Sequence, residues 1–282
     1  MKKKLINLII KITLLLSKIL YSLRLGRLII DTISSNSMDR VINIKYKNFI
    51  FFFVSPNYLN HWRLKTFALK EPETLDWIDN IDNNSVLWDI GANVGLYSIY
   101  AAKTKNCNVY AFEPSVFNLE LLARNIFQNN LTNKINILPF PLASKIGINK
   151  LNMTSTTWGG AISTFGSQAI GHDGKIMNKI FEFTTMGLTM DAAVELLKLP
   201  KPDYIKMDVD GIEHLILAGG LNTLKSVKSV LIEINDDFDE QRINASKILQ
   251  ASGLNLSKKL HSDLVENMIE FGRTYNQIWT RP

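Results

Sequence analysis

Two short apolar segments that end in acidic residues most constrain the fold of this chain. Val86–Gly95 reads VLWDIGANVG and Val109–Pro114 reads VYAFEP, so Glu113 follows Gly95 by eighteen residues. Gly91 and Gly95 permit a tight turn and a close approach of a ligand to the backbone. The free N–H groups of a following helix attract an anionic group. An acid at the tip of the next strand accepts hydrogen bonds from both ribose hydroxyls. The pattern predicts an adenosine-type ligand.

The residues of the loop separate two cofactors that fit this geometry. Dinucleotide binders use the tighter G-x-G-x-x-G, in which the pyrophosphate lies almost on the backbone. Here Asn93 stands at the middle position, and Asp89 would repel a pyrophosphate while suiting an ammonium group. The loop therefore favours S-adenosylmethionine, which carries an amino group, a carboxylate and a ribose. An NAD(P)-dependent oxidoreductase, a non-catalytic binding module and a generic tight turn remain as alternatives.

Five segments carry a resemblance to the FkbM family of S-adenosylmethionine-dependent methyltransferases. They are Trp88–Lys103, Val109–Ile126, Tyr204–Gly220, Val230–Asp236 and the closing NQIWTRP. Where the family typically has Asp-Val-Glu-Gly, this chain has Asp-Val-Asp-Gly, a shorter acid with the same charge. The resemblance implies a class I methyltransferase fold, S-adenosyl-L-methionine as cofactor and O-methylation of a sugar, a glycan or a related small metabolite.

Apolar strands alternate with helices along the body of the chain, which predicts a parallel sheet covered on both faces. The expected fold is α/β and Rossmann-like, with a doubly wound, mostly parallel sheet and an antiparallel C-terminal strand. A basic amphipathic helix over residues 1–35 is expected to precede a methyltransferase domain over 36–282. Within that domain we expect a β-hairpin and helix over 36–80 and a core over 81–282, with an insertion over 146–184.

The insertion is rich in Gly, Ser and Thr and contains Trp158 and Phe165. About thirty residues of this kind inside a domain are usually a functional loop or lid. Hydroxyls, amides and an aromatic face suit a sugar acceptor. A surface insertion without a function is the alternative.

Acidic side chains follow the later predicted strands and form the candidate catalytic site. Methyl transfer to an alcohol needs a general base, and clustered acids raise one another's pKa. Glu213 belongs to the same cluster, but Asp210 also suits a helix cap and His214 a packed core position. A divalent ion held by the same acids is the alternative, but no other His or Asp spacing supports a dedicated metal site. The expected catalytic residues are Asp208, Asp210, His214 and Glu233; the expected cofactor residues are Asp89, Gly91, Asn93, Gly95, Glu113, Ser144 and Asp208.

The positive charge of the chain is concentrated at its N-terminus. Residues 1–50 hold ten of the 32 Lys and Arg and two of the 26 Asp and Glu, so the remaining residues carry a small negative excess. The body therefore lacks the basic excess of a nucleic-acid-binding protein.

Residues 1–30 carry seven positive and no negative charges on an apolar background. Lys11 and Lys18 interrupt the run, so a spanning helix of about 20 apolar residues is disfavoured. The segment favours peripheral contact with an anionic membrane. Packing on the domain or on a second subunit in a homodimer is the alternative. The single Cys107 excludes an intramolecular disulfide. The expected location is cytoplasmic, at the inner face of the membrane if the helix binds lipid.

Overall fold

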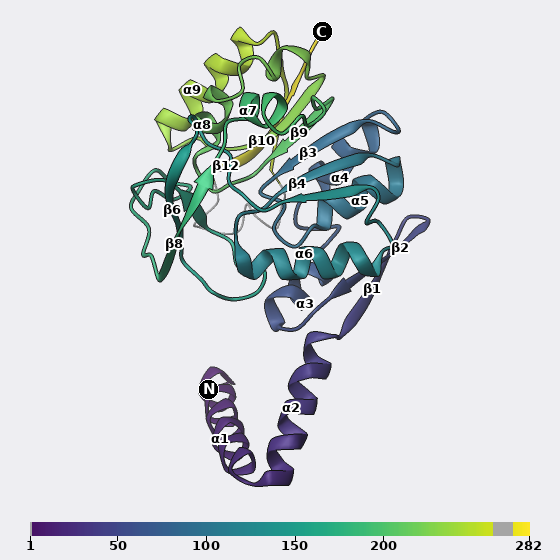
Figure 1. The fold of residues 1–282 in the computed structure, drawn as a ribbon, viewed down its shortest axis with the longest axis vertical. Coiled ribbons are helices and arrows are strands. Elements are labelled where there is room, and N and C mark those ends of the chain that lie inside the picture. Colours follow the sequence, from purple (N-terminus) through teal and green to yellow (C-terminus); the bar gives the residue numbers. More distant parts are fainter. Residues whose placement is uncertain (1, 262–272) are drawn as a thin grey trace.

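A seven-stranded sheet forms the centre of the computed structural model, which describes residues 2–261 and 273–282 (Figure 1). The strand order is β11-β12-β10-β9-β3-β4-β5, and β12 is antiparallel to both of its neighbours while the other pairs are parallel. The predicted doubly wound sheet with an antiparallel C-terminal strand is confirmed. The strands are β3 (Val86–Ile90), β4 (Asn108–Phe112), β5 (Ile135–Leu138), β9 (Tyr204–Met207), β10 (Ser229–Asn235), β11 (Asn255–Leu260) and β12 (Thr274–Thr280).

Helices cover both faces of this sheet because its central strands are apolar on both sides. Alternate residues of one strand enter different cores: Leu87 packs with the helices of one face, and Trp88 with those of the other. The first face carries α4 (Pro72–Asn80), α5 (Leu96–Lys105) and α6 (Val116–Gln128); the second carries α7 (Met190–Glu195), α8 (Glu213–Ala218) and α9 (Asp239–Ala251).

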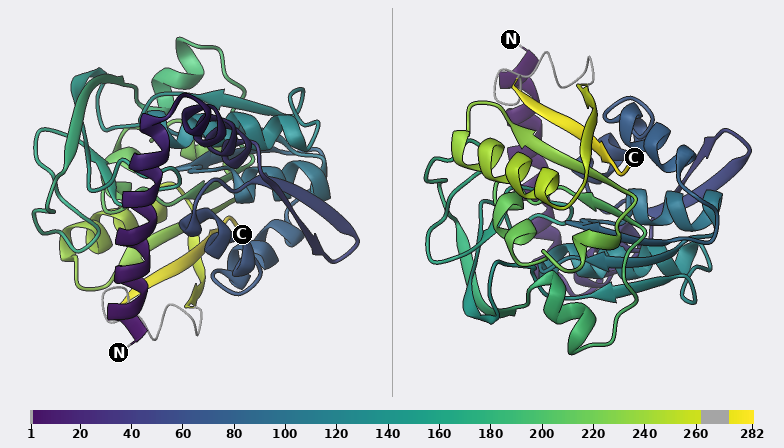
Figure 2. Two further views of the ribbon diagram at one scale, coloured as in Figure 1. Left: turned by 90° about the horizontal axis from the view of Figure 1, so that it is seen from below. Right: turned by 90° about the horizontal axis from the view of Figure 1, so that it is seen from above.

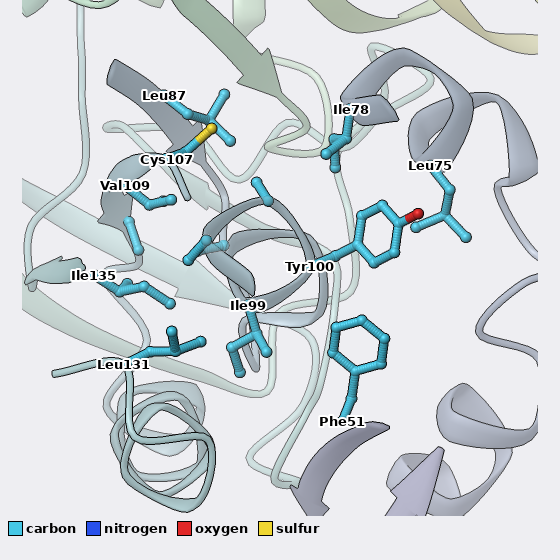
Figure 3. Close-up of a cluster of buried hydrophobic side chains, with 14 of the residues drawn as sticks. Phe51, Leu75, Ile78, Leu87, Ile99, Tyr100, Cys107, Val109, Leu131 and Ile135 are labelled. Atoms are coloured by element: carbon cyan, nitrogen blue, oxygen red, sulfur yellow. The ribbon is translucent and has the colours of Figure 1, made fainter. Parts of the chain in front are cut away.

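Helix α5 lies at the centre of the first core. Figure 3 shows the Tyr100 ring facing Leu75 and Ile78 of α4 and Phe51 of the N-terminal hairpin. Tyr100 has no exposed surface, and its hydroxyl donates to Asp79 Oδ1 at 2.8 Å. Cys107 is buried in the same core. This packing fixes the start of α5 and therefore the glycine loop that precedes it.

The order of the strands reverses between β3 and β9, and ligands of open α/β sheets bind at the carboxyl ends of strands at such a point. The loops that follow these two strands approach each other closely. Gly91 has φ +84°, and a Cβ atom at this position would lie 1.9 Å from the Asp208 carbonyl oxygen. A glycine is therefore required where the two loops meet.

The insertion forms a small antiparallel sheet with a connecting loop. Its strands are β6 (Gly147–Met153), β7 (Ser163–Phe165) and β8 (Phe181–Gly187), in the order β7-β6-β8. The sequence predicts only a loop or lid here, because Gly, Ser and Thr dominate and the alternation of apolar residues is short. Leu151 and Phe165 pack into the second core, so the sheet is anchored on the body.

The N-terminal segment forms two helices where the sequence predicts one. Helices α1 (Lys2–Ser22) and α2 (Arg24–Met38) meet at Leu23, whose extended backbone (φ −92°, ψ 140°) separates them. At Gly26 a Cβ atom would lie 2.0 Å from the Leu20 carbonyl oxygen, so glycine permits the sharp bend. Figure 1 shows the pair projecting from the body as a V, and Figure 2 shows α1 from below.

A β-hairpin and a short helix connect the helix pair to the sheet. Strands β1 (Val41–Tyr46) and β2 (Phe49–Val54) pair antiparallel, as predicted, and α3 (Tyr58–Lys65) follows them. Asn125 of α6 accepts a hydrogen bond from Val54 N at 2.7 Å, which attaches the hairpin to the domain.

Candidate functional site

Two adjoining hollows lie at the carboxyl ends of the strands. The first hollow runs between the glycine loop, Glu113, Phe140 and the insertion. The second hollow, of about 330 Å³, lies between the glycine loop, α3, the start of α4 and the ends of β9 and β10. The residues that line both hollows are Gly91, Asn93, Ala161, Asp208 and Asp210. A ligand that occupies both hollows therefore passes the glycine loop.

Glu113 lies in the wall of the first hollow, directly after β4. Its Oε2 accepts from Asn93 N and its Oε1 from Ser115 N, each at 2.8 Å. Burial raises the pKa of Glu113 to about 7, although these backbone donors favour the charged form. Each carboxylate oxygen has a second lone pair, so Glu113 has acceptor capacity left for a diol.

Some of the predicted residues of the glycine loop line the hollows, and others lie behind them. Gly91 and Asn93 line the hollows, and Asn93 adopts the left-handed conformation with φ +50°. Gly95, with φ +83°, precedes α5 and packs near Leu122. Asp89 lies beneath the loop, where its Oδ2 accepts from Ser98 Oγ at 2.5 Å. Asp89 lines neither hollow, so it acts on the site through its neighbours.

A buried lysine of strand β9 joins two of the predicted acids. Lys206 Nζ lies 3.4 Å from Asp208 Oδ2 and 3.7 Å from Asp89 Oδ1. Burial lowers the pKa of Lys206, but Asp208, Asp89 and Glu71 outweigh it and hold that pKa above its ordinary value. Lys206 therefore stays charged and neutralises the acids around it.

Asp210 connects the strand end to the insertion. Its Oδ2 accepts from Ile162 N at 2.8 Å and from Ser163 N at 3.2 Å. Asp210 has φ +62°, a left-handed conformation that is uncommon outside glycine. Burial and the neighbouring Asp208 raise the pKa of Asp210 to about 6. The carboxylate thus holds the insertion next to the two hollows through these hydrogen bonds. It does not act as the N-terminal cap of α8.

Glu233 joins these acids, whereas Glu213 and His214 do not. Glu233 of β10 lines the second hollow, and burial followed by repulsion from Asp208 and Asp210 raises its pKa well above the ordinary value. Glu213 is fully buried and accepts from Val209 N at 3.0 Å and from Gly211 N at 3.1 Å, so it braces the turn after β9. His214 lines neither hollow and packs edge-on against Phe238.

Two other predicted residues lie away from the hollows. Ser144 is exposed and lines neither of them. Trp158 also lines neither, but its carbonyl oxygen accepts from Asn57 Nδ2 at 3.0 Å and from Asn60 Nδ2 at 2.8 Å. Trp62 of α3 lines the second hollow instead. Phe67 and Tyr97 also line the second hollow, and the predicted Phe165 lines the first. The Trp62 ring comes from a helix that the sequence analysis does not predict.

Several charged residues of the second hollow were missed by sequence reasoning. Glu71, which directly precedes α4, is buried, and its Oε1 lies 2.6 Å from Lys70 Nζ. Burial raises the pKa of Glu71, but Lys70 and Lys206 outweigh it and bring that pKa down to about 2. The sequence does contain a sign of the role of Lys206, since a lysine lies within the apolar strand YIKM. Burying a lysine costs free energy unless an acid pairs with it, so its presence indicates a buried acidic partner. Further ionisable residues of this hollow that were not predicted include Arg63, Lys70, Glu73, Tyr97 and His261.

Comparison with known proteins gives a family match over most of the described body. The model of the methyltransferase FkbM domain matches residues 89–274. A hexuronic acid methyltransferase, AglP of Haloferax volcanii, is 27% identical over 203 residues, which cover 72% of this chain and 77% of that protein. A methyltransferase from Sordaria araneosa, sdnD, is 34% identical over 71 residues, 25% of this chain and 27% of that protein.

Solved structures of low sequence identity also resemble the chain. A putative transferase from Pyrococcus horikoshii has a TM-score of 0.47 at 9% identity, covering 86% of this chain and 71% of that one. A putative tRNA methyltransferase from Streptococcus pneumoniae, solved with S-adenosyl-L-methionine, has a TM-score of 0.42 at 14% identity, covering 74% of this chain and 72% of that one.

Proposed function

The chain belongs to the FkbM methyltransferase family, with S-adenosylmethionine as its cofactor, and we propose that it methylates a hydroxyl oxygen of a sugar or glycan. The family match replaces the alternative of an NAD(P)-dependent oxidoreductase. The second hollow is the observation that carries the proposal, because five carboxyl groups line it, and those of Asp208, Asp210 and Glu233 follow β9 or lie on β10. The hexuronic acid methyltransferase among the relatives supports a sugar as the acceptor.

The first hollow suits the adenosine half of the cofactor. Glu113 would accept from the ribose hydroxyls, and Phe112, Phe140 and Leu142 supply apolar surface for the adenine. The sulfonium would then lie near Asp208 and Asp210, which line both hollows. Its positive charge favours the ionised form of the neighbouring carboxyl groups.

Different acids of the second hollow deprotonate the acceptor hydroxyl and orient the acceptor. Asp208 is neutralised by Lys206, so we assign it to orienting the acceptor. Asp210 and Glu233 have raised pKa values, which suits a general base that works near neutral pH. The base takes the proton of the acceptor hydroxyl while the oxygen attacks the methyl carbon and the thioether leaves. The Trp62 ring offers a face for the apolar side of a sugar.

The test uses the purified full chain with S-adenosylmethionine labelled with ¹³C in its methyl group. Sugars and glycans, with and without uronic acids, are offered as acceptors. A methoxy signal in the ¹³C spectrum of a sugar product supports the proposal. Transfer only to nitrogen acceptors, or to a non-sugar hydroxyl compound, contradicts it.

The helix pair at the N-terminus supports a second proposal, peripheral attachment to an anionic membrane. The large apolar side chains of α1 from Leu5 to Tyr21 are 45–59% exposed, and Lys4–Ser22 is long and apolar enough to cross a membrane. Each basic residue close to an anionic surface contributes about 1 kcal/mol to binding. Because Lys11 and Lys18 lie within the apolar stretch, we favour a helix at the interface over a spanning one.

Flotation with liposomes tests this attachment in the full chain. The unsubstituted protein should float with anionic liposomes and be released by high salt, because screening shortens the reach of its charges. Lys11→Glu combined with Lys18→Glu should reduce flotation, whereas the same exchanges at Lys145 and Lys201 on the body should not. Equal flotation of both variants, or dimerisation without lipid binding, would contradict membrane attachment.

A further inference from the structure

Arg63 is a cation of the second hollow that has no carboxylate within ion-pairing distance among the described residues, although Glu71, Asp208 and Asp210 act on its charge at longer range. Lys70 is paired with Glu71 at 2.6 Å, and Lys206 lies within 4 Å of two aspartates. For Arg63, residues 2–261 and 273–282 supply no ion pair. Burying a guanidinium away from water costs free energy unless an anion binds to it.

The hydrogen bonds of Arg63 leave one buried donor unused. Its Nη2 donates to the Gly159 carbonyl oxygen at 2.7 Å, which fixes the guanidinium in the wall of the hollow. Its Nε is buried and has no acceptor within the described part of the chain. A planar guanidinium with free N–H groups matches a carboxylate, which accepts through both oxygens.

An unused acceptor lies on the wall of the same hollow. Asn93 Nδ2 donates to the Gly160 carbonyl oxygen at 3.0 Å, and this bond fixes the orientation of the amide. Asn93 Oδ1 is then buried without a donor among the residues described. A free donor at Arg63 and a free acceptor at Asn93 complement the carboxylate and the ammonium group of one α-amino acid.

From these contacts we propose that Arg63 is a carboxylate-binding residue and that its ligand is the methionine end of S-adenosylmethionine. Arg63 lies on α3, outside the residues that the family domain covers, 89–274. The first hollow takes the adenosine half, and Asn93, which lines both hollows, receives the ammonium group. The inference rests on the cofactor and not on the identity of the acceptor.

Calorimetry with two cofactor fragments tests the assignment. S-adenosylhomocysteine carries the amino acid end, and methylthioadenosine lacks it. Arg63→Gln should weaken binding of S-adenosylhomocysteine by about tenfold to a hundredfold, as expected for a charged hydrogen bond. Methylthioadenosine should bind this variant as it binds the unsubstituted protein. Arg63→Lys keeps the charge without the planar fork and should give an intermediate loss.

A matched control separates charge recognition from anchoring of the insertion. Asn60→Ala removes the neighbouring hydrogen bond to Trp158 O and leaves Arg63 in place. If Asn60→Ala weakens S-adenosylhomocysteine as much as Arg63→Gln does, or if Arg63→Gln weakens both fragments equally, Arg63 acts through the insertion and the proposal fails. Unchanged binding of S-adenosylhomocysteine by a folded Arg63→Gln variant also overturns the cofactor assignment.

An additional measurement uses glucuronate and glucose as probes with S-adenosylhomocysteine bound. If Arg63→Gln weakens only glucuronate, the subsite binds a carboxylate that belongs to the acceptor, and the methionine assignment is wrong. If glucuronate binding is unaffected while S-adenosylhomocysteine binding falls, the assignment stands. Binding of methylthioadenosine to the unsubstituted protein shows separately that the adenosine site is intact.

Discussion

The side of the first hollow around Glu113 is built from neighbouring segments of the chain, whereas the second hollow is assembled from distant ones. The glycine loop, Glu113 and Asn118 of the first hollow all lie within thirty residues of one another. The second hollow combines α3, the start of α4, strand ends of β9 and β10, and Asn276 of β12. Around Glu113 the first hollow uses backbone N–H groups, and it shares Asp208 and Asp210 with the second hollow. The second hollow relies on charged side chains that balance one another.

This difference decides how each hollow responds to substitution. Glu113 is held by backbone donors of its own neighbourhood, so its loss leaves no charge unpaired. Around Lys206, in contrast, each charged side chain faces others from separate elements. We therefore expect substitution of Glu113 to act on cofactor affinity, and substitutions of Lys206, Asp210 and Glu233 to act on turnover or stability. Arg63 is the exception in the second hollow, because its proposed ligand is the cofactor.

The largest effect is expected for the carboxyl groups of the second hollow. Glu233→Gln and Asp210→Asn should each lower kcat, by about 10²-fold to 10⁴-fold for the one that is the general base. Affinity for S-adenosylhomocysteine should change little, because the amides retain hydrogen-bonding capacity. Initial rates and calorimetry on the same preparations measure both quantities. A parallel fall of rate and affinity for Asp210→Asn would place Asp210 in the cofactor site.

Lys206→Met should give the next largest effect, on stability. Removal of one partner from a buried charge cluster costs about 3–5 kcal/mol, because the remaining charges lose their compensation. Lys228→Met is the matched control, since Lys228 pairs with Asp82 at an exposed position and exposed pairs contribute little to stability. Denaturant unfolding measures both variants. Equal losses would show that the second hollow tolerates an uncompensated charge.

Glu113→Ala tests the first hollow and should have a moderate effect. Affinity for S-adenosylhomocysteine should fall tenfold to a hundredfold, or about 1.4–2.8 kcal/mol, through loss of the ribose contacts. The fold should persist, because the core does not depend on this side chain. Calorimetry together with circular dichroism measures affinity and folding. Unchanged affinity in a folded variant would remove Glu113 from the ribose site.

The smallest effect is expected in the dependence of stability on pH. The pKa of Glu113 rises to about 7 in the folded state, above its ordinary value of 4.5, because the group is buried. The folded state then binds the proton more tightly, so this group's contribution to stability is present below the unfolded pKa and is lost as pH rises toward 7. Between pH 5 and 7.5 the loss should be about 1–2 kcal/mol.

Glu113→Gln should reduce that loss, because an amide does not titrate. Denaturant midpoints at the two pH values compare this variant with the unsubstituted protein. Glu182→Gln serves as the control, because Glu182 lies on the surface of the insertion and the pKa shift there is downward, through Lys179 and Lys150. If Glu113→Gln has the same pH dependence as the unsubstituted chain, Glu113 is ionised in the folded state throughout this range.

The central sheet, its flanking helices and the side of the first hollow around Glu113 could be predicted from the sequence. Alternating apolar segments predict strands and helices because burial follows the period of the backbone. The glycine loop and Glu113 were recognisable because a turn with positive φ and an acid at a strand tip are local features. Asp208 and Glu233 were also found, since carboxyl ends of neighbouring parallel strands share one edge of the sheet.

Tertiary structure alone decided which charged residues complete the second hollow. Arg63, Lys70 and Glu71 come from the segment before the sheet, and no periodicity of that segment indicates where they lie. Glu213 and His214 follow β9 only three and four residues after Asp210, yet the turn directs them into the interior. The pattern of buried residues is a local property, because it follows the period of each helix or strand. The pairing of buried charges depends on contacts between distant segments, which form only when the chain folds.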